Sequence, residues 1–222
     1  MDPLSQFPDD SIQIIICDKK IQGSLDFSRF TKLENLNCNC NYITELNNLP
    51  NTLIDLECFQ NNITNLDNLP DSLLKLSCGW NKIRELNNLP NSLQVLVCNN
   101  NEIIDLDYLP NSLQELYCYA NNITSLNNLP NSLIELSCGY NKIKILDNLP
   151  SSLEILSCQK NEIEELNNLP NSLIELYCYN NKLTNLDNLP NSLIKLDCMN
   201  NPINLEELTE KYPNILKLNN FL

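Results

Sequence analysis

The chain has 222 residues, 42% of them hydrophobic, and a formal net charge of −14, so it is too apolar to be a disordered acidic tail and can form a core. The negative charge disfavours binding to nucleic acids and anionic membranes, which are themselves polyanions. The chain has no histidine and only 3 glycines, which removes the commonest general base and metal ligand and argues against a glycine-rich phosphate loop.

Residues 1–32 predict an N-terminal tail and a cap coil. The first ten residues are acidic where a signal peptide would be basic, and the apolar run that follows is too short for a secretory signal or a membrane span. We therefore expect a cytoplasmic protein. The interior of the first coil and its lid are expected to come from Ile12, Ile15, Cys17, Leu25, Phe27 and Phe30.

Residues 33–203 repeat every 20 residues with the consensus L-x-x-L-x-C-x-x-N-x-I-x-x-L-x-x-L-P-x-S. A strict period of this length predicts a solenoid, in which stacked coils bury one another's apolar side chains. Leu56 and Cys58 lie two residues apart on a predicted strand and so face the interior together. The strands of successive coils are expected to form a parallel sheet with a spacing of about 4.8 Å.

The other repeated residues predict the turns. Asparagine follows each strand, from Asn41 to Asn201, and its amide can satisfy backbone groups where the chain turns inward, so we expect a buried asparagine ladder. The prolines suit an extended, solvated polyproline II segment on the convex side. Serine two residues after the proline, as at Ser72, can hydrogen-bond backbone entering the following strand. Little helix is expected in the repeats.

Three interpretations compete for the cysteines that recur at this spacing, which we name the column cysteines: Cys38, Cys58, Cys78, Cys98, Cys118, Cys138, Cys158, Cys178 and Cys198. Buried free thiols are favoured, because cysteine commonly acts as a small apolar side chain. Disulfides suit parallel in-register side chains poorly, and a linear row without histidine offers no tetrahedral metal site. Cys40 lies off the period, so we expect it to be partly exposed and a weak candidate nucleophile.

Residues 204–222 predict a C-terminal cap. Asn204 and Glu207 have the spacing of a helix N-cap and its partner at the third helical position. Leu205, Leu208 and Tyr212 would then share one face of a short helix. The rest of the lid is expected from Ile215, Leu216, Leu218 and Phe221. With both ends capped, we expect one domain.

The repeat resembles the leucine-rich repeat family. L-x-x-L-x-C-x-x-N-x-I is similar to the core of that family, and L-x-x-L-P-x-S is similar to its short class of about 20 residues in bacterial effector proteins. The Asn- and Ile-rich composition also resembles repeat proteins of giant DNA viruses. The resemblance implies a right-handed leucine-rich repeat solenoid with a parallel sheet on the concave face. It also implies action inside a host cell. Bacterial effectors of this class often carry a ligase domain after the repeats, and because the present sequence ends at Leu222 we expect no such domain here.

A candidate binding surface lies on the concave face, where residues three before, one before and one after each column cysteine point outward and the next residue forms a rim. The aromatic residues at these places are Phe59, Trp80, Tyr117, Tyr119, Tyr140, Tyr177 and Tyr179. The acidic residues there are Asp55, Glu57, Glu115, Glu135, Glu175 and Asp197, partly offset by Lys75, Lys160 and Lys195. Tryptophan and tyrosine anchor protein interfaces, whereas an ordinary preference for strands and for solubility would also explain these residues.

The sequence therefore favours a monomeric, non-enzymatic module that binds a protein partner, one with a basic patch, through its concave face. No cofactor, metal, nucleic acid or membrane is expected to take part. The alternative is a passive or polymorphic repeat protein without a dedicated ligand. An enzyme would need catalytic residues that interrupt the repeat, and Cys40 is the sole interruption.

Overall fold

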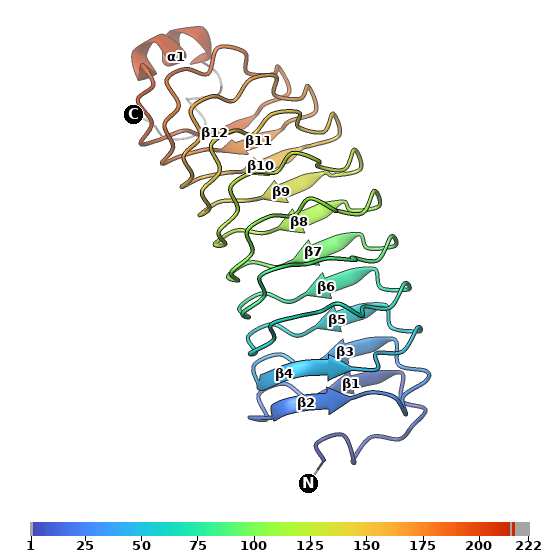
Figure 1. Cartoon of the computed structure of the whole chain (residues 1–222). Helices are drawn as coiled ribbons and strands as arrows, with labels where there is room; N and C mark the ends of the chain where they lie inside the picture. The colour runs from blue at the N-terminus through green and yellow to red at the C-terminus, as the bar shows by residue number, and fades with distance from the viewer. Residues whose placement is uncertain (1, 214, 216–222) are drawn as a thin grey trace.

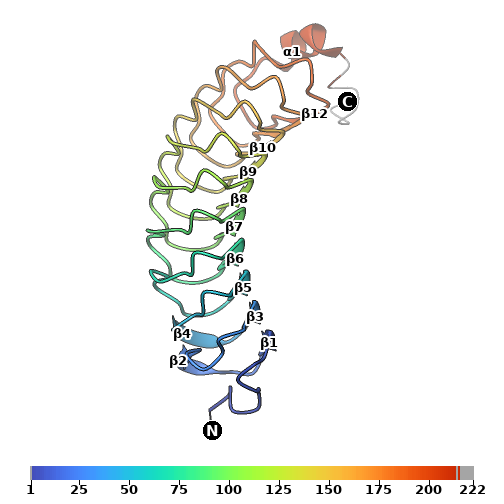
Figure 2. The same ribbon diagram turned by 90° about the vertical axis from the view of Figure 1, so that its right-hand side faces the viewer.

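The computed structural model describes residues 2–213 and residue 215 as a stack of coils that bends into an arc (Figures 1 and 2). One strand of each coil pairs in parallel with the next, and these strands form one sheet, in chain order, along the concave side. The ten strands are β1 (Gln13–Ile15), β3 (Asn35–Asn37), β5 (Asp55–Glu57), β6 (Lys75–Ser77), β7 (Val95–Val97), β8 (Glu115–Tyr117), β9 (Glu135–Ser137), β10 (Ile155–Ser157), β11 (Glu175–Tyr177) and β12 (Lys195–Asp197).

The core runs through the whole stack. Leu53, Leu56, Cys58 and Ile63 of one coil are fully buried, and the equivalent residues of the other coils repeat this pattern. All nine column cysteines are buried free thiols, as predicted. The strand pairing places each buried leucine beside the next, as Leu56 beside Leu76, so every coil closes the open face of its neighbour.

The asparagine ladder is confirmed in its hydrogen bonds, and five of its nine members are buried while the other four are half-buried. Asn121 shows its chemistry: the side-chain amide donates to the carbonyl oxygens of Cys98 and Cys118, each at 3.0 Å, and its oxygen accepts the Ile103 amide at 3.0 Å. One side chain thus satisfies backbone groups of two successive coils where the turn excludes water. The same set of bonds recurs from Asn41 to Asn201.

The convex segments differ from the expectation in one respect. No residue from 2 to 204 lies in a helix, but the prolines from Pro70 to Pro190 are buried, not solvated. The Pro70 carbonyl accepts the Leu73 amide at 3.1 Å, so each proline starts a tight turn that draws its ring against the core. Ser72 donates to the Leu53 carbonyl at 2.7 Å, which ties it to the preceding coil and not to its own strand.

The N-terminal coil is displaced from the predicted alternation. Ile14 and Ile16 are buried, whereas Ile12 and Ile15 are each 55% exposed and Cys17 is half-buried. Ile14 pairs with Leu36, a spacing of 22 and not 21 residues, and a one-residue change exchanges the two faces of a strand. The prediction that Leu25, Phe27 and Phe30 are interior residues at this end of the stack was correct.

Phe27 and Phe30 are fully buried and Leu25 nearly so. Leu25 belongs to β2 (Gln22–Asp26), which pairs with β4 (Tyr42–Asn47) in a second, two-stranded parallel sheet on the convex side (Figure 2).

At the other end lies the predicted helix, α1 (Leu205–Lys211). The Asn204 side chain accepts the amides of Glu206 and Glu207, so the predicted N-cap is confirmed. Leu208 is buried, but Leu205 is 46% exposed, so the predicted apolar face is narrower than expected. Tyr212 donates its hydroxyl to the Asp187 carbonyl at 2.7 Å and fastens the helix to the last coils. Ile215 packs on the core, and Leu216, Leu218 and Phe221 lie outside the described residues.

Candidate functional site

The concave face carries three rows of side chains and a rim. Residues three before, one before and one after each column cysteine form the first, second and third rows, and the residue two after it forms the rim. Paired strands hold equivalent residues side by side, as Asp55 beside Lys75 in the first row and Glu57 beside Ser77 in the second. Each site residue expected from the sequence occupies one of these places, and its exposure depends on its row.

The aromatic residues are most exposed on the rim. Trp80 and Tyr140 are 54% and 46% exposed. Tyr119 in the third row is 36% exposed, and the remaining aromatic residues of the rows, namely Phe59, Tyr117, Tyr177 and Tyr179, are half-buried. The Phe59 and Trp80 ring centroids lie 6.5 Å apart with tilted planes, so aromatic surface continues from one coil to the next.

Every rim residue has a left-handed backbone conformation. The φ angles run from 53° at Trp80 to 59° at Cys40, and the members are Cys40, Gln60, Trp80, Asn100, Ala120, Tyr140, Lys160, Asn180 and Asn200. Asparagine tolerates this region, whereas for a bulky residue it is strained. Three coils use asparagine here, so tryptophan and tyrosine at the same place are locally unfavourable choices.

Two glycines adjoin the exposed rim aromatics. A Cβ atom at Gly79 would lie 2.8 Å from Asn99 Oδ1 and 3.1 Å from Phe59 Cδ2. At Gly139 it would lie 2.7 Å from the amide group of Gln159. The third row is therefore filled at these coils by neighbouring side chains that lie across the glycines.

The acidic residues are partly unneutralised. Glu115 lies directly beside Glu135 in the first row, whereas Glu175 lies beside Lys195, whose Nζ is 3.5 Å from Glu175 Oε2. Burial, then the neighbouring Glu57, raises the pKa of Asp55, while Lys75 opposes the shift. Acidic groups thus outnumber cations over the middle of the face.

Tyr117 lies within the acidic part of the face. Its hydroxyl donates to Glu115 Oε2 at 3.1 Å. Burial, followed by the carboxylates of Glu135 and Glu115, raises the pKa of Tyr117 well above its usual range. The phenol therefore stays a hydrogen-bond donor throughout the physiological pH range.

A longer period of three coils escaped the sequence analysis. Residues 115–119 and 175–179 both read Glu-Leu-Tyr-Cys-Tyr, and residues 77–83 and 137–143 differ only in having Trp80 or Tyr140. Comparing residues sixty apart, instead of twenty, would have found it. The surface therefore presents similar groups repeatedly along the sheet.

The described residues offer little for catalysis. They contain no group of three or more His, Cys, Asp or Glu side chains placed to hold a metal ion. Burial raises the pKa of Cys78 and Cys138 to about 12, which leaves them as unreactive thiols. Cys40 is exposed, as predicted, and its Sγ lies 3.5 Å from Gln60 Oε1.

No protein-family profile matches the chain, and no curated protein sequence does so either. Solved structures do match. YopM from Yersinia enterocolitica WA-314 aligns with a TM-score of 0.75 and 36% identity over 77% of this chain and 38% of its own. A functional domain of InlJ from Listeria monocytogenes, which includes a cysteine ladder, aligns with a TM-score of 0.77 and 32% identity over 90% of this chain and 47% of its own. The chain is a leucine-rich repeat protein.

This leucine-rich repeat chain spans less than half the length of the YopM and InlJ chains. The fold is shared more widely. A TLR13 chain from a complex with the single-stranded RNA ssRNA13 aligns with a TM-score of 0.66 at 23% identity, which establishes likeness of fold alone. Among the residues placed by the structure, no helix is long and apolar enough to cross a membrane.

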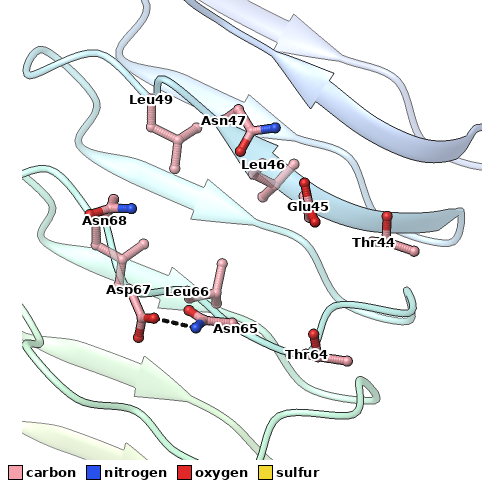
Figure 3. Close-up of a pocket in the computed structure, with 11 residues that line it drawn as sticks. Thr44, Glu45, Leu46, Asn47, Leu49, Thr64, Asn65, Leu66, Asp67 and Asn68 are labelled. Atoms are coloured by element: carbon pink, nitrogen blue, oxygen red, sulfur yellow. Dashed lines mark hydrogen bonds between the residues drawn. The ribbon is translucent and has the colours of Figure 1, made fainter.

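The convex side of the leucine-rich repeat stack opens between neighbouring coils. Beyond β4 the convex sheet ends, and a cavity of about 240 Å³ lies between residues 44–49 and 64–69 (Figure 3). Asn65 and Asp67 hydrogen-bond each other at its wall. The carboxylates on its lining are those of Glu45 and Asp67, which belong to no group of three or more potential metal ligands among the described residues, so the concave rows remain the candidate site.

Proposed function

We propose that this leucine-rich repeat protein is a non-enzymatic interaction module that binds a protein partner through the concave rows and rim. The observation that carries the proposal is the placement of Trp80 and Tyr140, two large, exposed aromatic residues at strained rim positions. Local strain that persists where a better residue is available is typical of functional sites. Solenoids commonly use their concave surfaces for binding.

The partner is proposed to carry a basic patch. The first and second rows bear Glu57, Glu115 and Glu135, so a basic protein would be attracted and held less tightly as salt rises. The same charge opposes binding of RNA, although the fold occurs in an RNA complex. We further propose that the protein acts as a monomer in a cytoplasmic compartment, including that of a host cell, since column thiols stay reduced there.

The test is affinity capture with a double variant, Trp80→Asn and Tyr140→Asn. Asparagine occupies the equivalent rim place in other coils, so this variant is expected to fold. The matched control is Tyr108→Asn, which removes a convex tyrosine that is 80% exposed and restores the asparagine of other repeats.

The proposal expects a protein, identified by mass spectrometry, that the wild type and Tyr108→Asn retain and the rim variant loses. Equal capture by all three folded proteins would refute the assignment of the concave face. That result would favour the alternative of a repeat protein without a dedicated ligand.

A further inference from the structure

The three-coil period brings the same glutamate–tyrosine pair to the surface twice. Tyr117 donates to Glu115 Oε2 at 3.1 Å, and Tyr177 donates to Glu175 Oε2 at 2.6 Å. Both pairs lie in identical five-residue segments, residues 115–119 and 175–179, which are three coils apart. They therefore present nearly the same hydrogen-bonded carboxylate beside a phenol ring.

The coils that follow the two pairs differ at several surface places, and one of these lies directly beside the glutamate. Lys195 lies beside Glu175 in the first row, whereas Glu135 occupies the equivalent place beside Glu115. Lys75 lies beside Asp55 in the corresponding earlier unit, so lysine is the residue found in two of the three units. The middle unit is the exception.

Lys195 shows how this surface holds a cation. Its ammonium lies 3.5 Å from Glu175 Oε2 and 4.9 Å from the centroid of the Tyr177 ring. The carboxylate supplies charge and the ring face adds a cation–π contact. The chain thus carries its own example of a primary ammonium on the glutamate–tyrosine pair.

The middle unit has the same receptor without the cation. Neither Glu115 nor Glu135 forms an ion pair among the described residues. Their strands are adjacent, with a backbone spacing of about 4.8 Å, and Glu115 and Glu135 are paired in register, so two half-buried side chains of like charge lie side by side and repel each other. A cation between them would relieve that repulsion.

The surroundings suit a side chain more than a free ion. In the first row Val95 lies beside Glu115, and Ile155 lies beside Glu135. Apolar neighbours of this kind can cover the aliphatic stem of a lysine while its ammonium stays near the acids.

We propose that the cluster of Glu115, Tyr117 and Glu135 receives the ammonium of a lysine presented by the partner protein, seated as Lys195 is seated on Glu175 and Tyr177. This inference rests on the proposed function, because the concave face must be the docking surface. It adds the chemistry of the partner's central contact.

The experiment is a titration of the full chain with Nα-acetyl-lysine amide at low salt, observed through the ring resonances of labelled tyrosine. Tyr117 and Tyr177 are assigned with the variants Tyr117→Phe and Tyr177→Phe. The wild type is expected to show a saturable shift at Tyr117 and none at Tyr177, where Lys195 occupies the site. The Nε-acetylated form of the same probe, which lacks the charge, should leave both rings unchanged.

Two reciprocal variants provide the decisive comparison. Glu135→Lys supplies the lysine found at the equivalent place in the other units, so it should fold, fill the site and weaken the probe at Tyr117 by at least about 5-fold. Lys195→Glu should open the second site, so that Tyr177 begins to respond. An unchanged Tyr117 response in Glu135→Lys, or similar shifts of both rings in the wild type, would overturn the proposal.

Spermidine separates a protein lysine from a free polyamine. Saturation of the Tyr117 shift at spermidine concentrations a hundredfold lower than for the lysine probe would identify a polyamine site and overturn the assignment.

The outcome for the lysine contact is also separable from that of the capture test. A partner lost by the rim variant but retained by Glu135→Lys would leave the docking face standing and refute the lysine contact.

Discussion

The asparagine that follows each column cysteine is the residue that couples coil to coil. Asn121 is 9% exposed and uses both ends of its amide on backbone groups of two coils. Apolar side chains stack the coils without direction, whereas these hydrogen bonds fix where each turn begins. The sequence period predicted this ladder because no other residue type recurs there.

Replacing Asn121 with alanine is expected to lower the free energy of unfolding by about 3 kcal/mol, since buried carbonyls of Cys98 and Cys118 and the Ile103 amide would lose their partner. Urea unfolding measures the change. Asn127→Ala, on the exposed convex segment, is the control and should alter stability by less than about 0.5 kcal/mol. A similar small change for both would show that the ladder is not structural.

Trp80→Asn is expected to raise the free energy of unfolding by about 1 kcal/mol, because asparagine adopts the left-handed conformation that Trp80 holds at φ 53° more readily. Thermal unfolding compares it with Tyr108→Asn, a tyrosine without positive φ, for which no gain is expected. A loss of stability would mean that the packing of Trp80 on Phe59 outweighs the strain. If the variant is more stable but no longer retains the partner, the rim aromatic residues lower stability in exchange for binding.

Residue-scale prediction was accurate for the column cysteines and asparagines, missed the burial of the equally periodic prolines, and failed where the period breaks. The column cysteines and asparagines followed from nine equivalent positions, each supporting the others. Ile12 and Ile15 were assigned to the interior because the first coil was aligned on Cys17, whose thiol hydrogen-bonds Asn37 Oδ1 at 2.6 Å. Burial in the first coil follows its pairing with β3, in which Ile14 lies beside Leu36, and the repeat does not encode that spacing of 22 residues.

At the scale of the coil, each strand and turn is shaped by the next coil along the stack. Gly139 is an example, since the amide group and the backbone oxygen of Gln159 lie close to the place that a Cβ atom of residue 139 would occupy. Gln159 Oε1 is buried and accepts no hydrogen bond there. Side chains of the third row thus interlock across coils, a relation that a single repeat cannot reveal.

Gly139→Ala is expected to cost about 1–2 kcal/mol of unfolding free energy, because the new Cβ would lie 2.7 Å from Gln159 Cδ and 3.0 Å from its backbone oxygen. Chemical denaturation of the single variants and of Gly139→Ala with Gln159→Ala forms a double-mutant cycle. The second change should recover part of the loss. Additive effects would show that the two residues do not interact as the structure places them.

The three-coil pattern is the part of the site that sequence reasoning missed at this scale. Alignment on twenty residues treats all coils alike, so Glu135 and Lys195 seemed to be unrelated surface charges. Alignment on sixty residues places them at the same position of successive units. Their roles then differ for a physical reason. Lys195 neutralises the neighbouring Glu175, whereas Glu135 repeats the negative charge of Glu115.

The arc as a whole depends on a continuous column of neutral thiols. Burial raises the pKa of Cys38, Cys78 and Cys138 to about 12 and, with a contribution from Asp197, that of Cys198 to about 11. The thiols of the other column cysteines shift in the same direction. Because the coils form one stack, ionisation of the column acts on the whole molecule.

The protein is therefore expected to unfold cooperatively in alkali. An unfolded thiol ionises near pH 8.5, so above that pH the unfolded chain binds fewer protons than the folded chain, and each column cysteine removes about 1.4 kcal/mol of stability per pH unit until the folded pKa is reached. Stability is fully present below about pH 8.5 and is lost as pH rises toward about 11 to 12. Circular dichroism along a pH series locates the midpoint.

The double variant Cys78→Ala with Cys138→Ala should make the transition less steep by about two protons, even though the cavities lower stability at pH 7. An equal slope for the wild type and this double variant would contradict a buried thiol column.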